Sequence, residues 1–288
     1  MKKLPIGFIK LKIRFLNLLD FFVYREDFEL RKLKQLKQSS SNHEQWMKTD
    51  WNLRAKRNPF YFVRTVKNQS EEGFWESGYA DRNAILESKS IKERFGKRFD
   101  NLKVLEIGCG IGRILIPMSE KFQESIGIDI SQEMVNIGKQ KTKNYSNCKI
   151  LLNNGLDLLD LSSNYFDFCY SFIVFQHIPK KLIIRNYIKE VARILKPSSC
   201  FRFQVRGMHL VDPIELRLLE KIGKKESICS EDTWLGVQFS SQEMQDIAEE
   251  FGFEIIEESG EGWPPGSIEG DPSTKAVRLV GFLRHRAA

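Results

Sequence analysis

The chain has 288 residues, of which 41% are hydrophobic and 29% are charged, and its formal net charge is +7. Residues 1–69 carry sixteen Lys and Arg against six Asp and Glu, so the rest of the chain has a net charge of −3. This distribution argues against a general nucleic-acid groove in the larger part of the chain, and the length suits one large domain with an appendage.

The cysteine pattern argues against a zinc or redox site. The five cysteines are widely separated and contain no C-x-x-C pair; they are Cys109, Cys148, Cys169, Cys200 and Cys229. We therefore expect no metal and a reducing, cytoplasmic compartment.

Residues 1–45 predict a basic amphipathic helix followed by a polar linker. Between residues 4 and 24, apolar side chains recur every three or four positions, at Phe8, Leu11, Phe15, Leu18 and Phe22. Lys, Arg and Asp interrupt this stretch too often for a membrane span, which needs about 20 apolar residues. The helix can pack on the protein itself, mediate dimerisation, or lie peripherally on an anionic membrane surface.

Residues 46–100 are rich in aromatic side chains mixed with charge, which predicts short helices that cap a binding cleft. A cap of this kind excludes water from the reaction that it covers. We expect Trp75 to contact a cofactor and Tyr79 to contact a substrate. Packing of the cap on the rest of the chain explains the same aromatic residues equally well.

A strand that ends in three glycines is the central feature of the sequence. Residues 102–107 have the apolar character of a strand buried on both faces, and Gly108, Gly110 and Gly112 follow at alternate positions. Glycine tolerates positive φ, and the helix predicted over 113–122 would present free N–H groups to the turn. These residues therefore predict a ligand-binding turn. The dinucleotide fingerprint does not match, because it needs glycine where this chain has arginine.

The order Glu-x-Gly-x-Gly-x-Gly, which begins at Glu106, resembles motif I of the class I S-adenosylmethionine-dependent methyltransferases. The resemblance implies that S-adenosyl-L-methionine is the cofactor and S-adenosyl-L-homocysteine the product. It also implies that the turn, including Cys109, packs against the methionine end of the cofactor and that Glu106 lies near the cofactor's ammonium group.

A second acidic residue, Asp129, lies near the end of the strand predicted over 124–130. It follows Glu106 by twenty-three residues. This distance suits a β-α-β unit, and a carboxylate beside the glycine turn can accept hydrogen bonds from both ribose hydroxyls of a nucleoside. Ser131 is a favourable N-cap for the next helix. We therefore expect Asp129, with Ile130 and Met134 nearby, to bind the cofactor.

The third strand, predicted over 148–152, leads into a turn that covers the adenine in the family. We expect Asn154, Gly155 and Leu156 to contact the adenine, and Asp157 is a competing candidate. The order Asn-Gly-Leu stands where the family more commonly has Gly-Asp.

The fourth strand begins with Phe-Asp at 166–167 and ends near Phe172. An α/β sheet binds its ligands at the carboxyl ends of its strands, which places Phe172 at the cofactor and Gln176 and His177 at the substrate. An imidazole at this point can take a proton from an attacking hydroxyl or amine. His177 is therefore the candidate general base, with packing or positioning as its alternative role.

The residues after 194 predict the last strands of the sheet and a segment that contacts the substrate. The residues at 195–199 predict a turn that precedes a strand over 201–205. Residues 207–239 form an insertion on the substrate side, and we expect Trp234 within it to contact the substrate. The last strand, over 276–283, is antiparallel in the family.

The resemblance implies an α/β fold: a Rossmann-like seven-stranded mixed sheet in the order 3-2-1-4-5-7-6, with an antiparallel last strand and an N-terminal helical cap. Residues 101–288 would form the methyltransferase domain. The implied function is methyl transfer to an oxygen or nitrogen of a small-molecule acceptor, such as a natural product, a sugar or a lipid-like metabolite. The alternatives are a non-catalytic S-adenosylmethionine-binding or membrane-recruited scaffold, and methylation of a protein. No nucleic-acid partner is expected.

Overall fold

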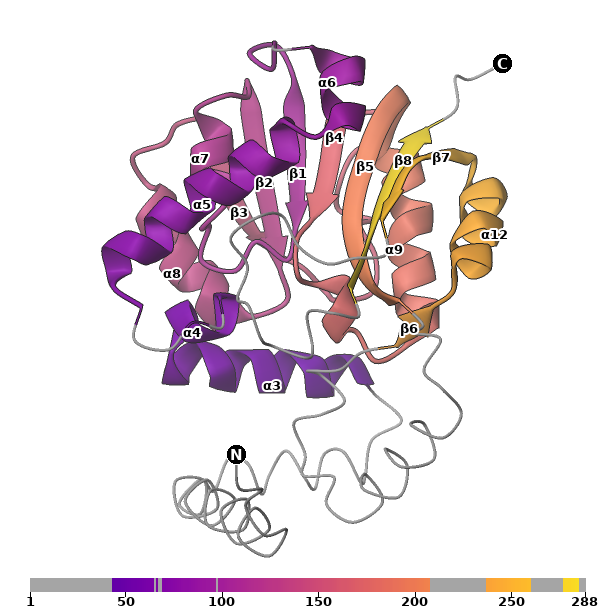
Figure 1. Ribbon diagram of the computed structural model, residues 1–288. Coiled ribbons are helices and arrows are strands. Elements are labelled where there is room, and N and C mark those ends of the chain that lie inside the picture. The colour runs from indigo at the N-terminus through magenta and orange to yellow at the C-terminus, as the bar shows by residue number, and fades with distance from the viewer. Residues whose placement is uncertain are drawn as a thin grey trace, which may run out of the picture. The chain divides into compact units, whose positions relative to one another are not determined.

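The computed structural model describes residues 43–64, 66, 69–96, 98–207, 237–259 and 277–284 (Figure 1). The chain divides into two compact units, Met1–Trp46 and Met47–Ala288. The elements below belong to the second unit, except for the first residues of helix α3 (His43–Arg57). The amphipathic helix predicted within residues 1–45 and most of the insertion at 207–239, including Trp234, lie outside the described residues.

The strands of the described residues are β1 (Lys103–Ile107), β2 (Glu124–Asp129), β3 (Cys148–Leu152), β4 (Phe166–Ser171), β5 (Leu195–Gly207), β6 (Gln238–Phe239), β7 (Phe253–Ser259) and β8 (Val277–Arg284). They form an eight-stranded sheet in the order β3-β2-β1-β4-β5-β8-β7, with β6 paired to β5. Neighbouring strands from β3 to β5 run parallel, whereas β8 runs antiparallel to both β5 and β7.

This sheet confirms the predicted Rossmann-like α/β class and the strand order 3-2-1-4-5. Beyond β5 it continues through the antiparallel strand β8 to β7. The sequence did not indicate β6, a two-residue strand that pairs with Arg206 and Gly207 at the end of β5.

The remaining helices are α4 (Pro59–Val63), α5 (Glu71–Leu86), α6 (Lys89–Phe95), α7 (Leu115–Ser119), α8 (Gln132–Thr142), the 3-10 helix η1 (Phe175–His177), α9 (Lys181–Ile194) and α12 (Ser241–Phe251). Helices α7 and α8 pack on β2 and β3, α9 packs on β5, and α12 packs on β7. Figure 1 shows α3 and α4 at the edge of the sheet where the parallel strands end. Ligands bind at this edge in α/β sheets.

Strand β4 illustrates why the centre of the sheet is buried. Phe166, Phe168 and Tyr170 alternate along it and are at most 1% exposed. Because alternate side chains of a strand share one face, these rings form an aromatic row, and the Phe168 and Tyr170 rings lie 5.8 Å apart. The row ends with Tyr170, whose hydroxyl reaches the neighbouring strand β1.

Two predicted elements differ from the structure. The helix predicted over 113–122 is the shorter α7, because Gly112, with a φ of 91°, still holds the chain in a turn before it. The turn predicted at 195–199 is instead the first part of β5. Ser198 has a φ of 64° there, and the pairing with β4 shifts register, so the segment is an irregular strand start and not a separate loop.

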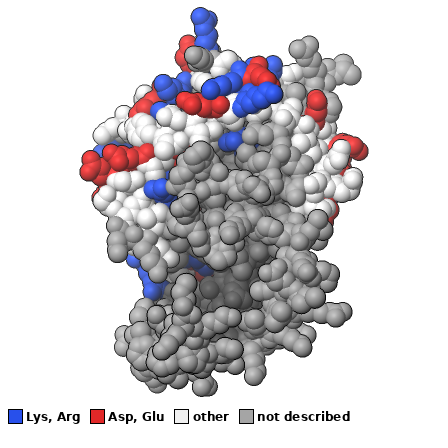
Figure 2. Space-filling view, in the orientation of Figure 1, with Lys and Arg blue, Asp and Glu red and all other residues white. Residues whose placement is uncertain are grey.

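Exposed charges join the first helices to the sheet domain. Lys56 of α3 lies 3.6 Å from Glu133, and Lys141 of α8 lies 2.7 Å from Glu71. Such exposed pairs contribute less than about 1 kcal/mol each, so they orient helices more than they stabilise them. On the face shown in Figure 2, Lys and Arg are interspersed with Asp and Glu over the described residues. None of the helices described has the length and apolar run that a membrane crossing requires.

Candidate active site

The glycine turn after β1 has the backbone conformation that the sequence predicted. Gly108, Gly110 and Gly112 have φ values of 75°, 54° and 91°, a region that side chains other than glycine rarely adopt. A Cβ atom at Gly108 would lie 2.3 Å from a methyl group of Val174, and one at Gly110 would lie 2.8 Å from a methyl group of Val63. The turn is therefore closely packed between the chain after β4 and helix α4.

Asp129 lies at the carboxyl end of β2, beside this turn. Its Oδ2 accepts a hydrogen bond from the Gly110 backbone nitrogen at 2.8 Å, and its Oδ1 accepts one from the Ser131 nitrogen at 2.8 Å. Burial raises the pKa of Asp129 to about 6, and these backbone hydrogen bonds oppose the rise. The predicted N-cap is also present, because the Ser131 hydroxyl accepts a hydrogen bond from the Met134 nitrogen at 3.2 Å.

Glu106 is the second carboxyl group of the cleft. It is 3% exposed, and its Oε2 accepts a hydrogen bond from the Tyr170 hydroxyl at 2.8 Å. Burial raises the pKa of Glu106 to about 8, while the Tyr170 hydrogen bond and the charge of Arg113 lower it and the charge of Asp129 raises it. Two carboxyl groups with raised pKa values in one cleft are typical of a functional site.

Arg113 closes the turn and ties it to helix α5. Its Nη1 donates to Asp81 Oδ2 at 2.5 Å and to Ser77 Oγ at 3.0 Å, and the residue is 2% exposed. The helix comes close here because Gly78 has no side chain: a Cβ atom there would lie 2.0 Å from the Arg113 carbonyl oxygen. Arg113 therefore joins the cap region to the end of β1 through an ion pair in which Arg113 is buried and Asp81 is partly exposed.

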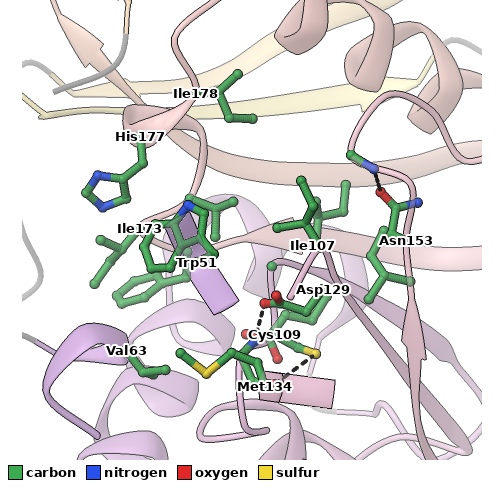
Figure 3. Close-up of a pocket in the computed structure, with 18 of the residues that line it drawn as sticks. Trp51, Val63, Ile107, Cys109, Asp129, Met134, Asn153, Ile173, His177 and Ile178 are labelled. Atoms are coloured by element: carbon green, nitrogen blue, oxygen red, sulfur yellow. Dashed lines mark hydrogen bonds between the residues drawn. The ribbon is translucent and has the colours of Figure 1, made fainter. Parts of the chain in front are cut away.

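These groups line one cleft, which encloses about 940 Å³ of space free of protein atoms, part of it open to solvent (Figure 3). Ten of the predicted site residues line it: Glu106, Gly108, Cys109, Gly110, Asp129, Ile130, Met134, Gly155, Phe172 and His177. Met134 lies on α8 and His177 on η1, and the other eight lie at or shortly after the ends of β1, β2, β3 and β4, which the parallel sheet brings to one edge.

Predicted adenine contacts are only partly found at this cleft. Asn154 and Leu156 do not line it, whereas their neighbours Asn153 and Gly155 do. Asn154 closes the turn instead: its Oδ1 accepts from the Leu156 nitrogen at 2.7 Å, and its Nδ2 donates to Asp157 at 2.7 Å. Such side-chain bonds to the following backbone are a common role of asparagine in turns. Asp157, the competing candidate, does not line the cleft either.

Trp75 and Tyr79 of α5 do not line the cleft. Trp75 packs against Phe74, with ring centroids 5.1 Å apart, and its Nε1 donates to Glu71 at 3.3 Å. The Tyr79 hydroxyl donates to Glu120 at 2.6 Å, which contributes to raising the pKa of Tyr79 to about 12. Both residues thus take the packing role that the sequence left open.

Two further predicted residues lie behind the cleft surface. Gly112 faces the core, where a Cβ atom would lie 3.3 Å from Ile150. Gln176 is 8% exposed and is not on the cleft lining, although its Nε2 lies 3.4 Å from Nε2 of His177. Gln176 therefore lies beside His177, the candidate general base, but does not line the cleft.

His177 lies on η1 and is 7% exposed. Its ring contacts the edge of Trp51, with ring centroids 5.8 Å apart, as Figure 3 shows. The Arg54 guanidinium packs over the rings of Trp51 and Phe62, at 5.3 and 5.2 Å from their centroids, and its Nε donates to Asp50 at 2.9 Å. This arrangement fixes two aromatic residues of the cleft wall.

The sequence interpretation did not single out several lining residues. Met47 and Trp51 of α3 and Phe62 and Val63 of α4 line the cleft, as does Arg113. The aromatic richness of residues 46–100 was the available signal for the first four, but it does not say which rings face inward. For Arg113 the signal was its place within the glycine motif, directly after the last glycine.

The described residues contain no group of His, Cys, Asp and Glu side chains that could hold a metal ion. The described cysteines, Cys109, Cys148, Cys169 and Cys200, are free and buried. Burial raises the pKa of each of these thiols, so their reactivity is low.

Solved structures share this fold. Magnesium protoporphyrin IX methyltransferase from Synechocystis PCC 6803, solved with bound S-adenosylhomocysteine, superposes with a TM-score of 0.54 at 18% identity. The match covers 81% of this chain and 94% of that one. The arrangement of sheet and helices is therefore that of the Rossmann-like methyltransferases.

Sequence comparisons find similarity over part of the chain. Residues 104–198 match the family described as "Methyltransferase domain". A demethylmenaquinone methyltransferase from Staphylococcus carnosus is 30% identical over 121 residues, which are 41% of this chain and 46% of that protein. One of the same name from Bacillus licheniformis is 27% identical over 145 residues, which are 46% and 61% of the two chains. The chain thus spans about half the length of these relatives, and its residues 104–198 are similar to a methyltransferase domain.

Proposed function

We propose that the whole chain is an enzyme that transfers a methyl group from S-adenosylmethionine to an oxygen or nitrogen of a small-molecule acceptor. The observation that carries the proposal is the convergence of Gly108, Gly110, Glu106 and Asp129 on one cleft at the ends of β1 and β2. Glycine backbone beside two carboxyl groups suits a nucleoside that bears an ammonium group.

The lining residues suit this cofactor along its length. Glu106 would bind its ammonium group, and Asp129, oriented by two backbone N–H groups, would accept hydrogen bonds from its ribose hydroxyls. Ile130 and Gly155 would contact the adenine, and Asn153 is a better candidate than Asn154 because it lines the cleft. The cofactor supplies a methyl group on a positively charged sulfur, so alignment and exclusion of water are the main tasks of the protein.

The region 46–100 would act as the cap of this cleft. Support comes from Met47 and Trp51 on α3 and from Phe62 and Val63 on α4, which add four apolar side chains to the lining. Apolar walls exclude water, which strengthens electrostatic interactions inside the cleft and limits competing hydrolysis.

His177 would serve as the general base. The acceptor atom forms a bond to the methyl carbon as the carbon–sulfur bond breaks, and the proton of the acceptor hydroxyl or amine passes to the imidazole. Support comes from the place of His177 on the cleft lining, directly after β4 and against Trp51.

The cleft wall around His177 favours an apolar acceptor. The lining also includes the apolar side chains of Phe62, Ile173, Val174 and Ile178. A pocket of this composition binds a lipid-like or quinone-like molecule better than a sugar, whose hydroxyl groups would lose their hydrogen bonds to water. The relatives named as demethylmenaquinone methyltransferases point the same way, since that acceptor is a quinone.

The basic segment would bring the enzyme to its acceptor. Peripheral contact of residues 4–24 with a membrane surface would give access to a lipid-like acceptor from the cytoplasm, and dimerisation through the same helix is the alternative. Both are predictions from the sequence pattern, because the segment lies outside the described residues. Trp234, as an acceptor contact, is a prediction of the same kind.

Calorimetry on the full chain tests the cofactor assignment. We expect S-adenosylhomocysteine to bind and NAD to give no heat. Asp129→Ala should weaken binding by about tenfold or more, since it removes charge-assisted hydrogen bonds to the ribose. Asp246→Ala, on the exposed surface of α12, is the matched control and should leave the affinity unchanged.

Turnover is the second readout. Transfer of a labelled methyl group to a panel of reduced quinones, lipid phenols and sugars should give product with an apolar member. Absence of binding by S-adenosylhomocysteine would contradict the proposal. Tight binding without transfer to any acceptor would instead support the non-catalytic scaffold.

A further inference from the structure

We infer that Gln204 is a positioning residue: it holds Ile173 in a left-handed backbone conformation and thereby fixes the place of His177 relative to the glycine turn. The inference deepens the proposed function and rests on it, because His177 is the proposed base and the turn is the proposed cofactor site. Gln204 lies on β5, is 2% exposed and does not line the cleft. It acts through the chain after β4 and not by contact with a ligand.

Ile173 has a costly backbone conformation. Its φ is 58°, a region that residues with a branched Cβ rarely adopt. Among the described residues other than glycine, Asn164 and Ser198 also have a positive φ. Asparagine adopts this region readily because its short polar side chain bonds to the nearby backbone, whereas isoleucine has no such compensation. The conformation of Ile173 therefore persists only if the surrounding structure holds it.

The side chain of Gln204 provides this support. Its Oε1 accepts a hydrogen bond from the backbone nitrogen of Ile173 at 2.8 Å. The pairing of β4 with β5 ends at Ser171 and Phe203, so Ile173 lies beyond the last pair, and the next residue of β5 takes its N–H. Glutamine is rarely buried, yet this one lies between the fully buried Phe203 and Val205. The hydrogen bond to Ile173 explains why a polar side chain stands there.

The turn at Ile173 sets the positions of two cleft residues. Val174 follows directly and packs on the glycine turn, where a Cβ atom at Gly108 would lie 2.3 Å from its methyl group. The carbonyl oxygen of Val174 accepts a hydrogen bond from the His177 nitrogen at 2.9 Å, at the start of η1. All three residues line the cleft, and Ile173 and His177 lie on the same side of it in Figure 3. The turn therefore connects the proposed cofactor site to the proposed base.

Pairing of one backbone N–H does not by itself account for this turn. A glycine at position 173 would adopt the same φ at little cost. The isoleucine side chain instead packs against a buried cluster that includes Phe172, so the backbone is held in a costly conformation while the side chain is used for packing. Without the acceptor on Gln204 the turn should relax, and Val174 and His177 should move with it. A displacement of about 1 Å between reacting groups can lower a rate on the order of 100-fold.

A double-mutant cycle on the full chain tests the inference. Gln204→Met removes the acceptor and keeps the length of the side chain, and Ile173→Gly removes the backbone cost and keeps the N–H. Hydrogen exchange at the amides of residues 174–178 is the first readout, and it needs no ligand. Gln204→Met should speed this exchange by roughly threefold or more in the unaltered chain. In the Ile173→Gly chain the same change should have little effect, because glycine keeps the turn without the bond.

Turnover is the second readout, with a naphthohydroquinone of short side chain as the methyl acceptor. Gln204→Met should lower kcat by about tenfold or more, whereas the affinity for S-adenosylhomocysteine should change by less than about threefold. When Ile173→Gly is already present, adding Gln204→Met should change kcat by less than about twofold. A loss of stability alone would lower kcat equally in both chains.

Asn147→Leu is the matched control. Asn147 directly precedes β3, at the opposite edge of the sheet, and its Nδ2 donates to the backbone oxygens of Ser119 and Phe122 at 2.7 and 3.0 Å. The variant loses side-chain bonds to the backbone, so it should be less stable, but exchange at 174–178 and kcat should stay unchanged. If Gln204→Met fails to fold, Gln204→Asn withdraws the amide oxygen by one carbon, and the same cycle applies.

The outcomes separate the two claims. Equal effects of Gln204→Met in the Ile173 and Ile173→Gly chains, or unchanged exchange at 174–178, would overturn the role of Gln204 and leave the methyltransferase proposal intact. Failure of S-adenosylhomocysteine to bind the unaltered chain would overturn the proposed function, and with it the catalytic meaning of this turn.

Discussion

Asn52 of α3 accepts a hydrogen bond from the Ser131 hydroxyl at 2.8 Å and another from the Glu133 backbone nitrogen at 3.2 Å. The side chain of one helix therefore caps the N-terminus of another, α8. Ser131 in turn donates its backbone N–H to Asp129, which holds the glycine turn through Gly110. A continuous chain of hydrogen bonds thus runs from α3 to the proposed cofactor carboxylate.

Asn52→Ala should loosen this connection. A hydrogen bond of this kind contributes roughly 1 kcal/mol, and two are lost, so we expect an affinity for S-adenosylhomocysteine about five- to thirtyfold lower. Calorimetry measures that effect, and faster hydrogen exchange in α3 would show its origin. Asn136→Ala, which removes an exposed amide contact with Gln132 on α8, should change neither quantity. Equal affinities in the two variants would show that α3 is not coupled to the site.

The buried carboxyl of Glu106 predicts a pH-dependent stability. Burial raises its pKa from 4.5 to about 8, so between these values the folded state keeps a proton that the unfolded state releases. The free energy of unfolding should therefore fall as the pH rises from about 4.5 to about 8, and the loss is complete above the folded-state pKa.

Glu106→Gln removes this ionisation and still accepts the Tyr170 hydrogen bond. Because one pKa unit corresponds to about 1.4 kcal/mol, the variant should be more stable than the unaltered chain by about 2 kcal/mol or more at pH 8.5 and equally stable near pH 4.5. Urea unfolding at several pH values measures this. Glu124→Gln is the control, since Glu124 also accepts a tyrosine hydroxyl, at 2.6 Å, but its side chain is 19% exposed. A gain at pH 8.5 in both variants, or in neither, would count against the buried carboxyl as the cause.

Local sequence patterns predicted the part of the site that local structure builds. The glycines of the turn need positive φ, Asp129 follows β2 at the distance of one β-α-β unit, and Ser131 caps the next helix. Each of these depends on residues close together in the chain. The cofactor and the strand order were predicted from the resemblance to a family, because no single motif indicates them.

The sequence could not predict which residues of the cap and of the turn after β3 face the cleft, because this depends on tertiary packing. Which aromatic residues of the cap face the cleft depends on how α3 and α5 pack, and Trp51 lines it whereas Trp75 does not. At the end of β3 the difference is a single residue. Asn153 faces the cleft, and Asn154 bonds to the turn that follows. To predict which of these two neighbouring residues faces the cleft, one must know the register of β3. That register is set by the pairing of the strands in the sheet.

Gly108→Ala should abolish cofactor binding. The added Cβ would lie 2.3 Å from Val174, and the residue has a φ of 75°, so the turn must shift away from the cleft lining. Gly96→Ala is a matched control: its φ is 63°, but nothing lies within 4 Å of the added Cβ. Both variants place an alanine at a positive φ and carry a backbone cost, whereas only Gly108→Ala adds a clash at the cleft. Thermal unfolding and calorimetry with S-adenosylhomocysteine separate the two effects. Binding by Gly108→Ala at the unaltered affinity would show that the turn does not contact the ligand.

His177→Gln tests the general base without removing bulk from the wall. If the imidazole takes the acceptor proton, kcat should fall by about 100-fold or more, while the affinity for S-adenosylhomocysteine stays within about twofold. The pH dependence of kcat should change as well, because the titrating group is lost. Trp51→Leu provides the contrast, since Trp51 contacts the His177 ring but carries no titratable group. It should raise the KM for an apolar acceptor more than it lowers kcat. A full kcat in His177→Gln would assign this histidine to packing against Trp51.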